Sequence, residues 1–156
     1  LMDACQVEKA YREIMENVKV KCPGAKIDGV LIQSMLPQGV EMIIGVNTDP
    51  QFGPMILCGL GGVFVEVFKD VSLYPAPLKK QEARDMIWSL KGSKLLNGYR
   101  GSKPCDVDAL AEFIVKISEY AVAHKDTLKE LDINPLFVYP EGEGAALADA
   151  LIVKEQ

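Results

Sequence analysis

Apolar residues recur at helical spacing near the start of the chain. Between residues 4 and 20 they keep the three- and four-residue intervals of one helix face, at Ala4, Val7, Ala10, Tyr11, Ile14, Met15 and Val18. Pro23 and Gly24 then end the pattern. The spacing predicts an amphipathic helix that leads straight into the next elements, with no strand or cap before it.

From Gly29 the period changes to that of β-structure. Short β-branched runs are separated by turn sequences, and they are GVLIQSML, EMIIGVNT, PMILCGL and VFVEVFKDV, at residues 29–36, 41–48, 54–60 and 63–71. Connections this short favour antiparallel pairing.

Two further helices and a pair of strands complete the pattern. Helical spacing covers residues 79–90 and 107–123, and Asp106 is placed to cap the second helix. Residues 130–153 predict two strands joined by the turn EGEG. The order of strands, helices and strands predicts an α+β fold, a mostly antiparallel sheet with helices packed on one face, and a single domain over residues 1–156.

Composition narrows the class of protein. A chain of 156 residues with 49% apolar and 25% charged residues is long enough to bury a sizeable core. It has no apolar run long enough for a membrane span and no signal peptide, so we expect a soluble, cytoplasmic protein with no membrane partner. The net charge of -5 argues against nucleic acid as a partner. Four widely spaced cysteines and one histidine argue against a zinc site or a disulfide.

One predicted strand carries polar residues among its apolar ones. Because alternate residues of a strand share a face, Glu130, Asp132 and Asn134 point to one side, and Leu131 and Ile133 to the other. A solvent-facing strand explains this pattern as well as a binding site does.

Asp149 extends the polar face if the turn falls at EGEG, since it then lies near Asn134 in the partner strand. Carboxylate and amide oxygens are ligands that suit Mg²⁺ rather than Zn²⁺. The Asn-Pro step at residues 134–135 is equally common in turns.

Other polar groups gather around the first predicted strands. Gln33, Ser34 and Met35 end one strand and Glu41 begins the next, which fits the rim of a small-molecule pocket and also fits an exposed hairpin.

The glycine-rich segments offer a phosphate-binding alternative to plain turns. Gly59, Gly61 and Gly62, followed by Glu66, form a turn that a phosphate or another loop could approach closely, although the P-loop pattern is absent. Arg100, between glycines, suits a phosphate or carboxylate and equally suits plain surface.

His124 lies just past a helix end, where the helix dipole favours it. No Ser/His/Asp or Cys/His set is evident around this one histidine.

Taken in order, several motifs form a pattern. The segments GVLIQSMLPQGVEMIIGVNTDPQFGPMILCGLGGVFVEVFKDVS, LLNGYRG, ELDINPLFV and ADALIV closely resemble the ATP-grasp part of the ADP-forming acyl-CoA synthetases, or acetate–CoA ligases (ADP-forming). Succinyl-CoA synthetase β subunits are more distant relatives of that family.

The resemblance implies a nucleotide site between two α+β subdomains, with this chain as the C-terminal one. The N-terminal subdomain would then be absent, and the chain would be a fragment or a subunit. The family interconverts acyl-CoA, ADP and phosphate with carboxylic acid, CoA and ATP, through an acyl phosphate and a phosphohistidine. The implied cofactors are Mg²⁺ and ADP or ATP. The implied partners are the missing subdomain and a CoA-binding subunit or domain that carries the phosphohistidine.

By position in the motifs, the resemblance also implies residue roles. Asn134 and Asp149 match the Mg²⁺ ligands, and Asp132 matches the acidic residue that faces the metal or the phosphohistidine. The hinge beside the adenine is matched by Gln33, Ser34 and Met35, the ribose-binding acid by Glu41, and the phosphate side by the GLGG turn (Gly59, Gly61, Gly62) with Glu66.

Two departures from the family are visible. The His-Lys-Thr-Asp motif and the nucleotide-binding lysine lie upstream of this chain, and AHKD around His124 stands at a helix end and does not take over that role. Family members often have Arg where this chain has Leu151.

Two other functions fit the sequence. One is a non-catalytic nucleotide-sensing or interaction module of a protein acyltransferase or multi-subunit assembly. The other is an unrelated ATP-grasp ligase, which the GVNTDPQFGP and GYRG motifs disfavour.

Overall fold

The computed structural model describes residues 3–62, 69–99 and 101–155. The chain divides into two compact units, residues 1–35 and 36–156. The prediction of one domain over residues 1–156 stays a prediction. The strand predicted over residues 63–71 falls mostly outside the described residues.

The first unit contains helix α1, Ala4–Lys21, which confirms the predicted helix. The prediction that no cap precedes it is wrong, because the Asp3 carboxylate accepts a hydrogen bond from the Gln6 N–H at 2.8 Å. Residues 22–39 form neither helix nor strand, so the strand predicted at 29–36 is also wrong. Leu31 and Met35 are 79% and 93% exposed there. A β-branched run forms a strand only where a neighbouring strand takes its hydrogen bonds and its apolar side chains are buried.

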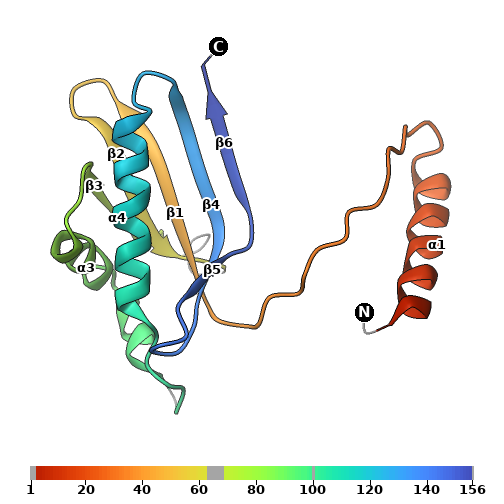
Figure 1. The fold of residues 1–156 in the computed structure, drawn as a ribbon, viewed down its shortest axis with the longest axis horizontal. Helices are drawn as coiled ribbons and strands as arrows, with labels where there is room; N and C mark the ends of the chain where they lie inside the picture. Colours follow the sequence, from red (N-terminus) through yellow and green to blue (C-terminus); the bar gives the residue numbers. More distant parts are fainter. Residues whose placement is uncertain (1–2, 63–68, 100, 156) are drawn as a thin grey trace. The chain divides into compact units, whose positions relative to one another are not determined.

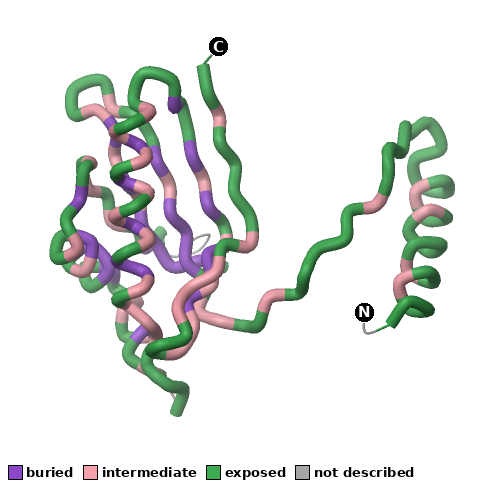
Figure 2. Tube along the Cα trace, in the orientation of Figure 1, coloured by how far each residue is buried: buried purple, intermediate pink, exposed green. Residues whose placement is uncertain are grey.

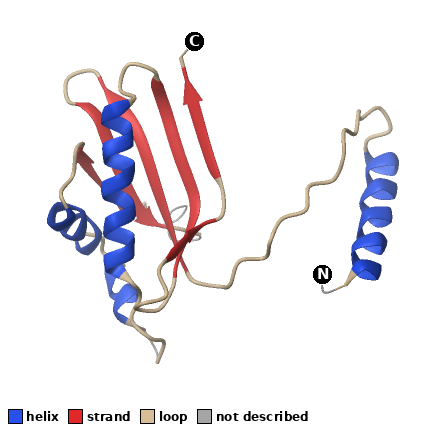
Figure 3. Cartoon of the chain, in the orientation of Figure 1, coloured by secondary structure: helices blue, strands red, loops and turns tan. Residues whose placement is uncertain are grey.

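The second unit is an antiparallel sheet with helices on one face (Figures 1 and 3). Its elements are β1 Val40–Asp49, β2 Gly53–Leu60, β3 Val71–Pro75, α3 Lys80–Trp88, the 3₁₀ helix η1 Ser93–Asn97, α4 Val107–Ala123, β4 Leu128–Val138, β5 Ala145–Leu147 and β6 Ala150–Lys154. The strand order is β3-β2-β1-β4-β5. The strand β6 also pairs with β4, along residues 128–133, whereas β5 pairs with residues 136–138. All pairs between the described strands are antiparallel. The predicted α+β fold is confirmed, and β3 is a strand that was not predicted from the sequence.

The core lies between the sheet and the two helices, where the buried segments of the strands and helices meet (Figure 2). In β1 the alternate residues Met42, Ile44 and Val46 are almost completely buried. They belong to one apolar cluster with Met86 of α3 and Ile114 of α4. A sheet with one covered face requires this period of two, and the sequence of β1 supplies it.

Polar contacts join the two helices to each other and to the chain before α3. The buried hydroxyl of Ser118 on α4 accepts the Leu78 N–H at 3.0 Å. On the surface, Lys80 lies 2.6 Å from Glu112 and 3.4 Å from Asp108, and Arg84 pairs with the same Asp108. These contacts fix α3 against α4 over the sheet.

Asp106 confirms its predicted role as the cap of α4 and also binds a distant turn. One carboxylate oxygen accepts the Ala109 N–H at 2.9 Å, and the other accepts the N–H groups of Gly142 and Gly144 at 3.0 and 3.1 Å. Its own N–H donates to the Tyr139 carbonyl at 2.8 Å. The hydrogen bonds, led by that from Ala109, lower the pKa of Asp106. Asp106 thus ties the start of the helix to the turn between β4 and β5.

Among the described residues, no helix has the length and apolar character that a membrane crossing requires.

We expect Asp106→Ala to lower the free energy of unfolding by about 1 kcal/mol or more at neutral pH, the usual cost of losing a helix cap. Because the folded pKa is lowered, the carboxylate stabilises the fold above its ordinary pKa and loses this effect as the pH falls through the folded value. The difference in free energy of unfolding between the unaltered protein and Asp106→Ala should therefore shrink below about pH 4. Urea unfolding followed by circular dichroism measures it. Asp106→Asn, which retains an acceptor, serves as the control, and a difference that does not change with pH would contradict the prediction.

The cysteines provide a second test of the fold. Cys58 on β2 is completely buried, and burial raises the pKa of its thiol to about 12, whereas Cys5 and Cys22 are exposed. We expect iodoacetamide to modify Cys5 and Cys22 quickly and Cys58 only after unfolding. Mass spectrometry of timed digests, with and without urea, measures this order. Modification of native Cys58 at the rate of Cys5 would show that the core packing described here is wrong.

Candidate functional site

The face of the sheet opposite the helices carries a row of side chains that crosses five strands. The register places Leu73, Leu57, Gly45, Asp132 and Leu151 side by side, on β3, β2, β1, β4 and β6. Leu73 and Leu57 make one end of the row apolar. Near the other end, Asp132 adds a carboxylate between Gly45 and Leu151. Leu151 of β6 pairs with Asp132, so the neighbour of this carboxylate brings no positive charge.

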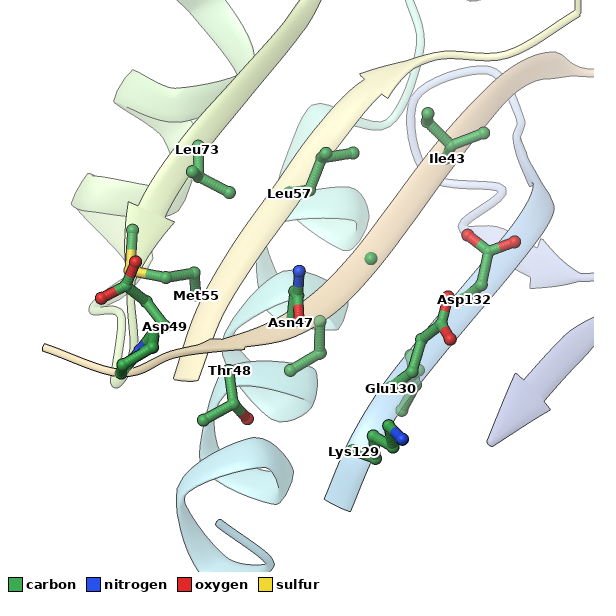
Figure 4. Close-up of a pocket in the computed structure, with 14 residues that line it drawn as sticks. Ile43, Asn47, Thr48, Asp49, Met55, Leu57, Leu73, Lys129, Glu130 and Asp132 are labelled. Carbon is green, nitrogen blue, oxygen red and sulfur yellow. The ribbon is translucent and has the colours of Figure 1, made fainter. Parts of the chain in front are cut away.

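Gly45 leaves a hollow in the middle of this row. With no side chain between Leu57 and Asp132, the sheet surface forms a cavity of about 750 Å³. Its lining includes Asn47 of β1 and Glu130 of β4, which pair with each other across the strands. Figure 4 shows Asn47, Glu130 and Asp132 on the same side of the strands as Leu57. We call this hollow the Gly45 pocket.

The predicted polar face of β4 is present. Leu131 and Ile133 are buried, whereas Glu130 and Asn134 are exposed and Asp132 is partly buried. Burial, followed by the nearby carboxylates of Glu130 and Asp149, raises the pKa of Asp132. Three carboxylates, those of Glu130, Asp132 and Asp149, therefore lie near one another on this side of the strands, and Lys129 lines the same pocket as the first two.

Asp149 lies beside Asn134, as the turn at EGEG predicted. The Asn134 N–H donates to the Asp149 carbonyl at 3.2 Å, and the Asp149 carboxylate accepts the N–H of Ala150 at 2.9 Å. The partner of β4 is not one strand, however, because it breaks between β5 and β6 at residues 148–149. Asp149 thus stands at a gap between two strands.

The donors in this region are oxygen atoms of carboxylates and an amide, which is the chemistry that Mg²⁺ prefers. In the described ranges, no cluster of three or more His, Cys, Asp or Glu side chains is arranged to hold a metal by itself. Asn134 and Asp149 fit a Mg²⁺ ion that takes its other ligands from water and phosphate. The assignment of these ligands, and of Asp132 as a catalytic residue, stays a prediction.

Glu41 and the glycine turn lie together at the end of the sheet. The Gly61 N–H donates to the Glu41 carbonyl at 2.7 Å, and a Cβ on Gly61 would lie 2.8 Å from that of Glu41. Gly62 has φ +61°, and a Cβ there would lie 3.1 Å from a Glu41 carboxylate oxygen. With Tyr99 and Ser102, these residues line a second cavity of about 460 Å³, which we call the Glu41 pocket. The glycines therefore make room for Glu41, and their phosphate role stays a prediction.

Gly59 has a packing role. A Cβ on this residue would lie 2.9 Å from Cγ1 of Val71 and 3.0 Å from the carbonyl oxygen of Asp70. Only glycine fits this point of the sheet without displacing β3.

The remaining predicted residues lie in the first unit or outside the described residues. Gln33, Ser34 and Met35 lie in the first unit and have exposed side chains. Glu66 and Arg100 lie outside the described residues.

Several residues that line the pockets were not predicted from the sequence. Gly45, Asn47 and Leu57 were not singled out, although the alternation of EMIIGVNT places Gly45 and Asn47 on the face opposite the core. Tyr99 and Ser102 carry no comparable signal, because they lie in a loop.

Comparison with known protein families identifies the architecture. The model of the ATP-grasp domain matches residues 1–153. The chain belongs to the ATP-grasp family.

Similar ATP-grasp proteins are ADP-forming ligases. The chain is 46% identical over 148 residues to the acetate–CoA ligase (ADP-forming) II subunit beta of Pyrococcus furiosus, covering 95% of this chain and 63% of the relative. It is 43% identical to 4-hydroxybutyrate–CoA ligase (ADP-forming) of Nitrosopumilus maritimus, covering 97% of this chain and 22% of that protein. The chain thus spans less than two thirds of these relatives. The resemblance to ADP-forming acetate–CoA ligases is confirmed.

A solved structure has the same fold. Acetyl-coenzyme A synthetase 1 of Ca. Korarchaeum cryptofilum, in complex with coenzyme A, acetyl-coenzyme A and a phosphorylated phosphohistidine segment, matches with a TM-score of 0.90 and 46% identity. The match covers 99% of this ATP-grasp chain and 68% of the other. A structure of the same synthetase in complex with coenzyme A and Mg-AMPPCP matches with a TM-score of 0.85 and 42% identity, and covers 99% of this chain and 66% of that one.

The two glycines of the open face give a paired test. A Cβ on Gly45 would be in ordinary contact with Leu57 at 3.5 Å, so we expect Gly45→Ala to raise the free energy of unfolding by about 0.5 kcal/mol, by removing the entropy cost of glycine in a strand. Gly59→Ala should lower it by about 1 kcal/mol or more, because its Cβ meets Val71 and the backbone of Asp70. Urea unfolding of both variants measures this, and equal effects would rule out the register described above.

Proposed function

We propose that this chain is the nucleotide- and Mg²⁺-binding portion of an ADP-forming acyl-CoA (acetyl-CoA) synthetase. The full enzyme would interconvert acyl-CoA, ADP and phosphate with carboxylic acid, CoA and ATP, through an acyl phosphate and a phosphohistidine. The observation that carries the proposal is the oxygen-rich open face, where Asp132, Asn134 and Asp149 come together on β4 and beside it. The names of the relatives support the same activity.

The chain's own residues fit the needs of phosphoryl transfer, which depends mainly on positioning and on neutralising charge. Asn134 and Asp149 would hold Mg²⁺, which neutralises phosphate charge when bound. Asp132 would then orient the incoming phosphohistidine through its carboxylate. Glu41 would accept hydrogen bonds from the ribose hydroxyls.

The residues of the first unit complete the nucleotide assignment. Gln33, Ser34 and Met35 are proposed to line the adenine, as their position in the family motifs implies. Glu66 is proposed as a catalytic residue on the phosphate side, where Arg100 and the turn with Gly59, Gly61 and Gly62 are proposed to contact phosphate. Glu66 and Arg100 lie outside the described residues.

We propose that other parts of the protein supply the rest of the site. More than a third of the P. furiosus relative lies outside the match, which covers 63% of that protein. An N-terminal ATP-grasp subdomain and a CoA-binding subunit or domain with the phosphohistidine would complete the enzyme. The isolated chain would then have little or no ligase activity.

We expect Asp149→Ala to abolish Mg²⁺-dependent binding of ADP in the full-length protein, because it removes the only charged group of the proposed ligand pair. Titration calorimetry with ADP, with and without Mg²⁺, measures the loss. Asp85→Ala is the matched control, since Asp85 is an exposed carboxylate on α3 in the helix layer and should leave binding unchanged.

Two outcomes would contradict the proposed function. One is a full-length protein that binds no ADP with Mg²⁺ present. The other is an Asp149→Ala protein that binds Mg-ADP as tightly as the unaltered one.

A further inference from the structure

The hydroxyl of Ser102 fixes the backbone of Tyr99. The Tyr99 N–H donates to Ser102 Oγ at 2.9 Å, and the same hydroxyl donates to the Tyr99 carbonyl at 2.9 Å. The Ser102 N–H also donates to that carbonyl, at 3.2 Å. Both backbone polar groups of Tyr99 are therefore held by one residue, three positions further along the chain.

The ends of this loop are anchored as well. Gly98 has φ +85°, and a Cβ there would lie 2.4 Å from the Ser102 carbonyl oxygen, so only glycine allows the loop to close on itself. Beyond the loop, the Cys105 N–H donates to the Leu96 carbonyl at 2.8 Å. The position of Tyr99 is thus set by the fold before any ligand arrives.

Tyr99 and Ser102 both line the Glu41 pocket, in which the carboxylate of Glu41 suits a sugar better than a phosphate, while the phosphate role of the lining glycines Gly61 and Gly62 stays a prediction. Val40, Leu60 and Leu95 give it apolar walls, and Glu41 adds a carboxylate. A carboxylate repels a phosphate group and accepts hydrogen bonds from hydroxyl groups. A volume of about 460 Å³ lies within the usual range of small-molecule sites. Tyr99 lines this pocket and is 55% exposed, so a ligand can reach it.

We propose that the ring of Tyr99 packs against the ribose of the bound nucleotide in the Glu41 pocket, and that Ser102 is a positioning residue that holds Tyr99 in place. This inference rests on the proposed nucleotide-binding function. It adds two residues, in a loop far along the chain from Glu41, to the part of the site that recognises the sugar.

The test uses two ligands that share phosphate groups but differ in the sugar. The dissociation constants of Mg-ADP and of Mg-tripolyphosphate are measured by titration calorimetry on the full-length protein. We expect Tyr99→Ala and Ser102→Ala each to weaken Mg-ADP binding by about 3- to 10-fold, the range expected for losing one contact of moderate strength. Binding of Mg-tripolyphosphate should not change.

Conservative variants separate a positioning role from a loss of folding. Tyr99→Phe retains the ring and Ser102→Thr retains the hydroxyl, so both should bind Mg-ADP nearly as well as the unaltered protein. Ser93→Ala is the matched control, because its hydroxyl donates to the Trp88 carbonyl at 3.4 Å and Ser93 does not line the pocket. Circular dichroism verifies that each variant is folded.

Each result decides the matter. Tyr99→Ala binding both ligands equally weakly, or both as tightly as the unaltered protein, overturns the inference, as does a Ser102→Thr variant as weak as Ser102→Ala. If the unaltered protein binds no Mg-ADP, the proposed function fails together with this inference. If Asp149→Ala abolishes binding while Tyr99→Ala has no effect, only the inference fails.

Discussion

The alternation of buried and more exposed residues in the middle of β4, from Glu130 to Asn134, is the constraint on which the second unit depends. This strand pairs with β1 on one side and with β5 and β6 on the other, so its register sets that of its neighbours. The helices fill one face, which takes Leu131 and Ile133 and leaves Asp132 for the other. A slip of one residue would bury the carboxylate and expose both leucine and isoleucine, and burying an unpaired charge is costly. Stability and the acidic open face therefore have one cause.

Much of the fold was predictable because its signals are local. Helical spacing found α1, α3 and α4, and Asp106 was found as a cap because capping depends on a few neighbouring residues. The failure at residues 29–36 has the opposite cause, since a strand depends on a partner that local sequence does not reveal. The same applies to the break at residues 148–149, which lies opposite Asn134 and Pro135, between the part of β4 that pairs with β5 and the part that pairs with β6.

The candidate site was predictable only where one short turn sets the geometry. Asn134 and Asp149 could be paired because the chain reverses between them through a few glycine-rich residues. Gly45 was not predicted because it has no side chain that suggests a chemical role. It belongs to the pocket because it lies between Leu57 and Asp132 of the neighbouring strands. Tyr99 lines the same pocket as Glu41, although they lie 58 positions apart in the sequence, because the loop after η1 lies at the end of the sheet. Which distant residues come to line one pocket depends on the whole fold, so a local sequence pattern does not predict it.

The pairing of β1 with β4 has a consequence for how the protein forms. Val40 pairs with Val138, and all of β2, β3 and the helix layer lie between them in the sequence. During synthesis β1 and β2 can form their hairpin early, but the central ladder must wait until β4 has left the ribosome. Until then, one edge of β1 and its apolar face are exposed together, which makes the nascent chain vulnerable to aggregation. The strand that completes the acidic face is thus also the strand that ends this vulnerable period.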